Sequence, residues 1–174
     1  MKKNNKGFTL IEIIIAIGIM SIVVTSVLFF LIININNFAK LRTDAELQFQ
    51  SQYIMNFVSN KIMESSNVEV IKMGRKDVMN GTDEYSITKI SLRYGTYNNN
   101  CYIFEIRNNK IYYENSYSYD SADKELGRYI KELKASPYPS GTTFEQSDAL
   151  VLTICLFDNG QEYTSKQIIY MRNS

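Results

Sequence analysis

Residues 6–12 read Lys6-Gly7-Phe8-Thr9-Leu10-Ile11-Glu12, and an almost wholly apolar run continues from them to residue 33. Glu12 is the only charged residue between residues 8 and 33. A run of this length can cross a hydrocarbon core of ~30 Å at about 1.5 Å per helical residue. A carboxylate within such a run costs roughly 2.5–3.5 kcal/mol on insertion scales. We therefore interpret Glu12 as a residue that serves a function.

The order Gly7-Phe8-Thr9-Leu10-Ile11-Glu12 resembles the cleavage and methylation motif of type IV prepilins and pseudopilins. The resemblance of the motif covers residues 1–34, and beyond them the chain resembles the family only in its layout. It implies that a membrane prepilin peptidase cuts between Gly7 and Phe8 and that the new Phe8 amine is methylated. It also implies that Glu12 meets the terminal amine of a neighbouring subunit.

Two other interpretations of residues 8–33 compete with a pilin helix. An ordinary secretory signal has an apolar core of only about 7–15 residues followed by a cleavage site with small residues. Here the run is longer, and residues 35–38 fit such a site poorly. A plain membrane anchor explains the length of the run but not the order of residues 7–12.

The chemistry of Gly7 and Glu12 agrees with the implied roles. A glycine lets a peptidase approach the backbone closely, because no side chain blocks it. Opposite unit charges ~4 Å apart attract by about 4 kcal/mol at an effective dielectric constant of ~20. A pair between Glu12 and an amine would therefore relieve a buried carboxylate and set the stagger of subunits. The alternatives are a merely flexible junction at Gly7 and a Glu12 that reaches the membrane surface without a partner.

The pattern predicts an α+β pilin fold, in which one long helix over about residues 8–65 packs on an antiparallel β-sheet head. The resemblance implies that residues 1–7 form a leader that is cleaved and that residues 8–34 form the hydrophobic transmembrane and assembly helix. Residues 35–174 form a globular head that includes the amphipathic half of the helix. Lysines before the apolar run keep the N-terminus cytoplasmic and place the head outside the cytoplasm.

Apolar residues recur at mostly four-residue spacing through the second half of the helix, which is typical of an amphipathic helix. We expect this stripe to pack against the head; its members are Phe38, Leu41, Ala45, Phe49, Tyr53, Phe57 and Ile62.

The rest of the chain predicts strands and turns. Strands are expected over residues 68–71, 85–94, 101–107, 110–117, 129–133, 148–157 and 163–172. Loops are expected over 72–84, 118–125 and 137–141. Tight turns are expected at Asn108-Asn109 and Asp158-Asn159-Gly160, since Asn and Gly tolerate positive φ.

Composition excludes several classes of site. The chain of 174 residues has a net charge of +1, which gives no firm evidence for nucleic-acid binding. It has no histidine, the commonest general base and transition-metal ligand. The sequence therefore indicates neither an enzyme, a metal site nor a cofactor.

Three weaker features each have a functional and a structural interpretation. Cys101 and Cys155 can form a disulfide outside the cytoplasm, or remain buried thiols. Asp120, Asp123 and Glu125 can bind Ca²⁺, although a solvated loop is favoured. A tyrosine-dense region can bind a ligand, although strand propensity and packing favour a structural role; it comprises Tyr94, Tyr97, Tyr102, Tyr112, Tyr113, Tyr117 and Tyr119.

The sequence thus predicts a structural subunit, a minor pilin or pseudopilin of a type IV pilus or of a related type II secretion or DNA-uptake filament. Its implied partners are other pilin or pseudopilin subunits and the prepilin peptidase/methyltransferase. An inner-membrane platform protein and an assembly ATPase act indirectly, and the membrane holds the subunit before assembly. The alternative is a membrane-anchored module that binds glycan or DNA and does not assemble.

Overall fold

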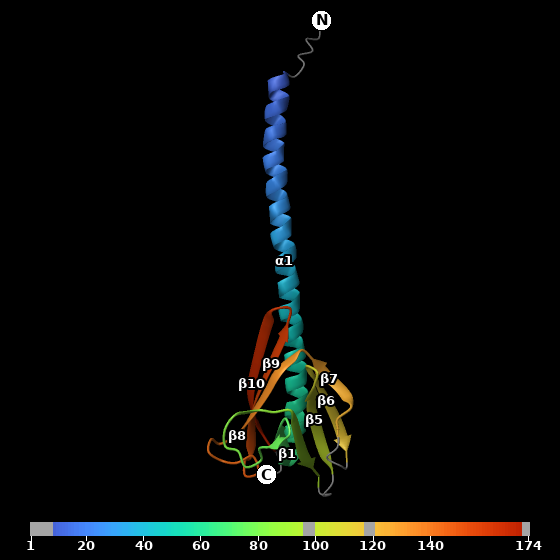
Figure 1. Ribbon diagram of the computed structural model, residues 1–174, viewed down its shortest axis with the longest axis vertical. Helices are drawn as coiled ribbons and strands as arrows, with labels where there is room; N and C mark the ends of the chain where they lie inside the picture. The colour runs from blue at the N-terminus through green and yellow to red at the C-terminus, as the bar shows by residue number, and fades with distance from the viewer. Residues whose placement is uncertain (1–8, 96–99, 117–120, 172–174) are drawn as a thin grey trace. The chain divides into compact units, whose positions relative to one another are not determined.

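The structure, a computed structural model, describes residues 9–95, 100–116 and 121–171. The chain divides into two compact units, Met1–Arg42 and Thr43–Ser174. Helix α1 (Leu10–Met63) supplies the described part of the first unit after Thr9 and the beginning of the second (Figure 1). The single long helix predicted from the sequence is therefore confirmed, and its first residue in the structure is Leu10.

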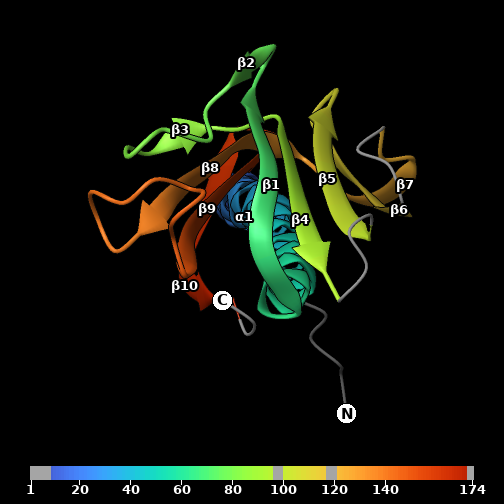
Figure 2. The same ribbon diagram turned by 90° about the horizontal axis from the view of Figure 1, so that it is seen from below.

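The second unit contains two antiparallel sheets beside α1 (Figure 2). The first sheet has six strands in the order β2-β1-β4-β5-β6-β7, and the second has four in the order β10-β9-β8-β3. The strands are β1 (Ser65–Met73), β2 (Lys76–Asp77), β3 (Tyr85–Ser86), β4 (Lys89–Tyr94), β5 (Cys101–Arg107), β6 (Lys110–Ser116), β7 (Lys124–Arg128), β8 (Ile130–Tyr138), β9 (Ala149–Asp158) and β10 (Gln161–Tyr170). The expected fold, one long helix packed against antiparallel sheets, is confirmed.

The chain passes from the first sheet to the second for the last time at Tyr129, between β7 and β8. Tyr129 has a φ of 69°, which is uncommon for a residue with a side chain. The carbonyl of Tyr129 accepts a hydrogen bond from Phe157 N–H at 2.8 Å, and Ile130 N–H donates to the Asn109 carbonyl at 2.9 Å. These bonds tie the crossing point to both sheets.

The helix buries a different face from the one that the sequence predicted. Its buried apolar residues in the head are Leu47, Ile54, Met55, Val58 and Ile62. Of the predicted stripe, Phe49 and Tyr53 remain 64% and 49% exposed, Phe57 is half-buried, and only Ile62 is fully buried. The prediction was wrong because two apolar stripes run along this helix, and spacing alone does not say which one meets the sheets.

Several strand boundaries also differ from the prediction. The expected strand over 85–94 is two strands, β3 and β4, in different sheets. The expected loop over 72–84 contains the end of β1 and all of β2, and β7 begins within the expected loop over 118–125. Strand β8 continues through Pro137, where a loop was expected. Proline is tolerated there because β3 pairs with β8 only at residues 134 and 135, so this end of β8 has one neighbour.

Both predicted hairpin turns are confirmed. Asn108 and Asn109 have φ values of 51° and 59°, and Asn159 and Gly160 have values of 46° and 78°. Positive φ at both central residues is what a type I′ turn requires, and its twist matches that of the strands.

Candidate functional site

The first turn of α1 is closed by a reciprocal pair of hydrogen bonds between Thr9 and Glu12. Thr9 N–H and Thr9 Oγ1 both donate to Glu12 Oε2 at 2.8 Å, and Glu12 N–H donates to Thr9 Oγ1 at 3.4 Å. This is a capping box, in which a threonine before the helix and a glutamate three residues later satisfy each other's main-chain N–H groups. A carboxylate in the first turn also complements the positive end of the helix dipole.

The capping box was not recognised from the sequence, although its signal was present. Threonine followed three residues later by glutamate, immediately before an apolar run, is the sequence signature of a helix start. Glu12 was interpreted only as an assembly residue. The structure shows that its side chain bonds Thr9 at the helix start.

Polar residues farther along the apolar run bond to their own helix. Ser21 Oγ donates to the Gly18 carbonyl at 2.7 Å, Thr25 Oγ1 to the Ser21 carbonyl at 2.7 Å, and Ser26 Oγ to the Ile22 carbonyl at 2.8 Å. Their hydroxyl donors are therefore satisfied without water, as an apolar surrounding requires.

The exposed apolar surface of this unit is long enough to cross a membrane. Every large apolar side chain from residue 10 to residue 41 is exposed. An 18-residue window of α1 has a mean hydropathy of 2.8, and none of that window is buried. Length and composition thus allow this part of α1 to span a membrane. The hydroxyls of Ser21, Thr25 and Ser26 lie in the same part, and each already bonds a main-chain carbonyl.

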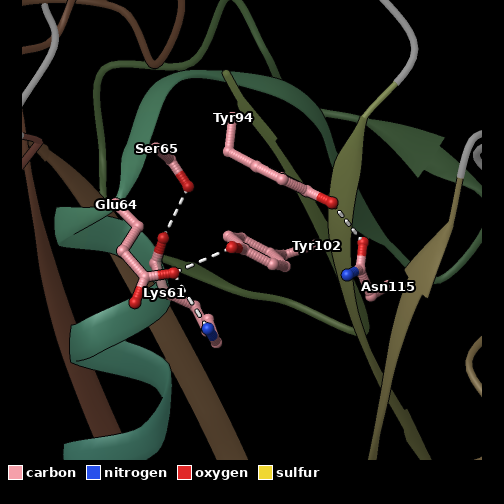
Figure 3. A network of polar contacts seen from close by, with 6 residues as sticks. All are labelled: Lys61, Glu64, Ser65, Tyr94, Tyr102 and Asn115. Carbon is pink, nitrogen blue, oxygen red and sulfur yellow. Dashed lines mark hydrogen bonds and ion pairs between the residues drawn. The ribbon is translucent and has the colours of Figure 1, made fainter.

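At the other end of α1, a polar network joins the helix to the first sheet (Figure 3). Glu64 Oε2 pairs with Lys61 Nζ at 2.9 Å and accepts a hydrogen bond from Tyr102 Oη at 2.8 Å. The Tyr102 ring stacks on Tyr94, with ring centroids 4.1 Å apart, and Tyr94 Oη donates to Asn115 Oδ1 at 2.6 Å. The bonds from Lys61 and then Tyr102 lower the pKa of Glu64, and burial is the main cause that raises the pKa of Tyr102.

The comparisons with known proteins address the beginning of the chain. Residues 2–28 match the family model described as "Prokaryotic N-terminal methylation motif". The chain therefore begins with the prepilin-type methylation motif that is typical of type IV pilin-like proteins. No curated protein and no solved structure matches it. The match supports the prepilin-type motif, while the pilin subclass is not resolved by it.

One part of the site predicted from the sequence lies within the described residues and one part lies outside them. Glu12 lies in the first turn of α1, four residues before Ala16 on the exposed apolar run. The two residues predicted for processing, Gly7 and Phe8, lie outside the described residues. The methylation motif implies processing by a prepilin peptidase, and the family is generally one of non-enzymatic structural proteins.

The disulfide considered between Cys101 and Cys155 is absent, and both residues are buried thiols. Cys101 lies on β5 of the first sheet and Cys155 on β9 of the second. Cys101 Sγ donates to the Ser116 carbonyl at 3.2 Å, and Cys155 Sγ to Glu162 Oε1 at 3.0 Å. The structure therefore matches the other interpretation, in which each thiol is part of its own sheet.

The acidic loop considered for Ca²⁺ is engaged with cationic side chains where it is described. Glu125 lies 2.6 Å from Lys110 Nζ and 3.2 Å from Arg128 Nη2, and Asp123 lies 3.6 Å from Arg107 Nη2. No cluster with metal-binding composition occurs among residues 9–95, 100–116 and 121–171. Asp120 lies outside these ranges.

The tyrosine-dense region is largely part of the core where the structure describes it. Tyr102 is buried, and Tyr113 packs edge-on against Phe57 with centroids 4.9 Å apart. Tyr112 lies under the Arg107 guanidinium, 4.5 Å from it. Packing therefore explains these rings; Tyr97, Tyr117 and Tyr119 lie outside the described residues.

Proposed function

We propose that this pilin-like protein is a structural subunit, a minor pilin or pseudopilin, of a type IV pilus or of a related secretion or DNA-uptake filament. It is inserted in the membrane with its head outside, cut after Gly7, methylated at Phe8 and assembled through its N-terminal helix. The observation that carries the proposal is the methylation motif at residues 2–28, together with the apolar part of α1, in which every large apolar side chain from residue 10 to residue 41 is exposed. Such a helix needs lipid or other subunits around it.

In the assembled filament, Glu12 pairs with the terminal amine of a neighbouring subunit. Little hydrophobic free energy is gained when a helix leaves lipid for protein. Close packing and the charge pair must therefore drive the transfer of the subunit from the membrane into the filament. The capping box leaves room for this pair. Both Thr9 donors use Oε2 of Glu12, and a carboxylate has about four lone-pair positions on its two oxygens.

The experiment compares Glu12→Ala with Thr9→Ala in cells that carry a prepilin peptidase and an assembly system. Glu12→Ala removes both the cap and the charge, whereas Thr9→Ala removes the cap and keeps the charge. We expect both variants to be cleaved at Gly7. Glu12→Ala should be depleted in sheared filaments by at least about tenfold, which corresponds to ~1.4 kcal/mol, while Thr9→Ala should assemble far better.

Two results would contradict parts of this proposal. Equal assembly of Glu12→Ala and the parent would show that the carboxylate has no role in assembly. Equal loss in both variants would show that Glu12 acts through the helix cap alone.

Abundance of the parent in sheared filaments tests the subclass, since a dominant band would identify a major rather than a minor subunit.

A further inference from the structure

The four edge strands of the head differ greatly in how they are protected. Strands β2 and β3 have two residues each, and β7 has five, four of them charged or glycine, with an irregular register against β6. Short length, charge and bulges are the usual means by which proteins prevent edge-to-edge pairing. Strand β10 is an edge of ten residues paired in regular register with β9. Among the described strands, β10 is therefore the edge that offers the longest regular row of main-chain groups to another strand.

The turn before β10 determines which main-chain groups point outward. The type I′ turn at Asn159-Gly160 bonds the Asp158 carbonyl to Gln161 N–H, so odd-numbered residues of β10 face β9. Met171 N–H agrees with this parity, because it donates to the Asp148 carbonyl at 2.9 Å. The N–H and carbonyl groups of even-numbered residues point away from β9, where the described residues provide no main-chain partner.

The side chains of the same even-numbered residues carry a self-complementary charge pattern. Glu162, Thr164 and Lys166 are exposed and alternate along one face of β10. We propose that two copies of this protein pair through antiparallel β10 strands, with Thr164 of one copy opposite Thr164 of the other. Glu162 then lies opposite Lys166 twice by symmetry, within a ladder over residues 161–167.

Other registers lose this complementarity. A two-fold axis at Ser165 places Glu162 opposite Ile168 and Lys166 opposite Thr164. A two-fold axis at Lys166 places two lysines opposite each other, which is destabilising. Of these registers, the one centred on Thr164 pairs the outward N–H and carbonyl groups of the two strands and also places Glu162 opposite Lys166.

The charged groups are available for such a pair. Glu162 is bonded to Lys131 and Cys155, and Lys166 Nζ lies 3.9 Å from Glu84. The side chains of Glu162 and Lys166 are 45% and 62% exposed. Ion pairs this exposed contribute only about 0–1 kcal/mol, so both groups can turn to a second copy at little cost.

The direction of β10 indicates where two copies meet, and this step rests on the proposed function. Strand β10 lies along the head's part of α1 and runs in the same direction, with Ser59 Oγ donating to Gln167 Oε1 at 3.1 Å (Figure 1). Antiparallel pairing reverses one head relative to the other. Subunits of one filament share one direction, so the contact joins two filaments that lie side by side in opposite directions.

The test is disulfide cross-linking of the full chain in detergent under mild oxidant, with Thr164→Cys and Lys166→Cys compared. All chains carry Cys155→Ser, since Cys155 lies opposite residue 164 on β9 and would bond the new thiol within one molecule. Two residues at position 164 have Cα atoms about 5.5 Å apart in this register, within the ~4.4–6.8 Å range of disulfides. Those at position 166 are offset by about 13 Å along the strands.

We expect at least tenfold more covalent dimer from Thr164→Cys than from Lys166→Cys or from the Cys155→Ser parent. Equal yields, or no dimer from Thr164→Cys, would overturn the proposal. As a second measurement, Glu162→Lys should abolish side-by-side filament association, and Glu162→Lys with Lys166→Glu should restore it. Absence of the parent chain from sheared filaments would contradict the proposed function, whereas its presence in filaments that stay unassociated, with no cross-link, would contradict this inference alone.

Discussion

Gly127 lies so close to Ile54 that a Cβ on the glycine would be 2.5 Å from Ile54 Cδ1 and 2.7 Å from Ile54 Cγ1. Gly127 is on β7 and Ile54 on the buried face of α1, so this contact fixes how closely the edge of the first sheet approaches the helix. The close approach, rather than a special backbone conformation, explains the glycine.

Gly127→Ala should lower the free energy of unfolding by about 1–3 kcal/mol, because the added methyl overpacks the core. Ile54→Val removes Cδ1, the nearer of the two atoms, so the double variant should lose less than the sum of the single variants. Denaturation of the four chains in one detergent, followed by circular dichroism, measures this coupling. Additive losses would show that the two residues do not meet.

The buried and exposed stripes of α1 should respond differently to truncation. Ile62→Ala should cost about 2–5 kcal/mol, since Ile62 is fully buried. Phe49→Ala should change the stability by at most about 0.5 kcal/mol, because Phe49 is 64% exposed in the subunit. Both are measured by the same denaturation assay. A larger loss of stability for Phe49→Ala would show that the stripe predicted from the sequence packs against the head after all.

These two stripes show how far sequence patterns determine this fold. The helix, its length and both Asn-containing turns followed from periodicity, the lack of early proline and the residues that accept positive φ. The packed face did not, because Phe49 and Ile54 both lie on apolar stripes and only the sheets decide between them. The break between β3 and β4 is likewise set by pairing with distant strands.

Tyr102→Phe should destabilise the head by about 1.5–3 kcal/mol near neutral pH, because a hydrogen bond to a carboxylate is lost. The bond helps to lower the pKa of Glu64 in the folded chain. Glu64 therefore contributes stability above its unfolded pKa, and this contribution is lost as pH falls through the folded pKa. The free energy of unfolding is measured for both chains at pH 7 and pH 3. The difference between parent and variant should be smaller at pH 3.

Tyr94→Phe is the matched control for this experiment. Its hydroxyl bonds Asn115, an uncharged residue, so its effect should not change between the two pH values. A pH-independent loss in Tyr102→Phe would contradict the role given to Glu64.

The candidate site was predicted from the sequence in part. The motif at residues 7–12 pointed to processing and assembly, because a lone carboxylate in an apolar run is costly. The capping role of Glu12 was missed, since the same carboxylate was assigned to an interaction between subunits. The edge of β10 could not be foreseen, because its exposure depends on the order of strands in the second sheet.

The most direct test of the central claim is the intact mass of the chain isolated from membranes of cells that contain a prepilin peptidase. We expect a mass that begins at Phe8 and includes one added methyl group on its amine. A mass that begins at Met1 would contradict processing and favour a membrane-anchored module that does not assemble.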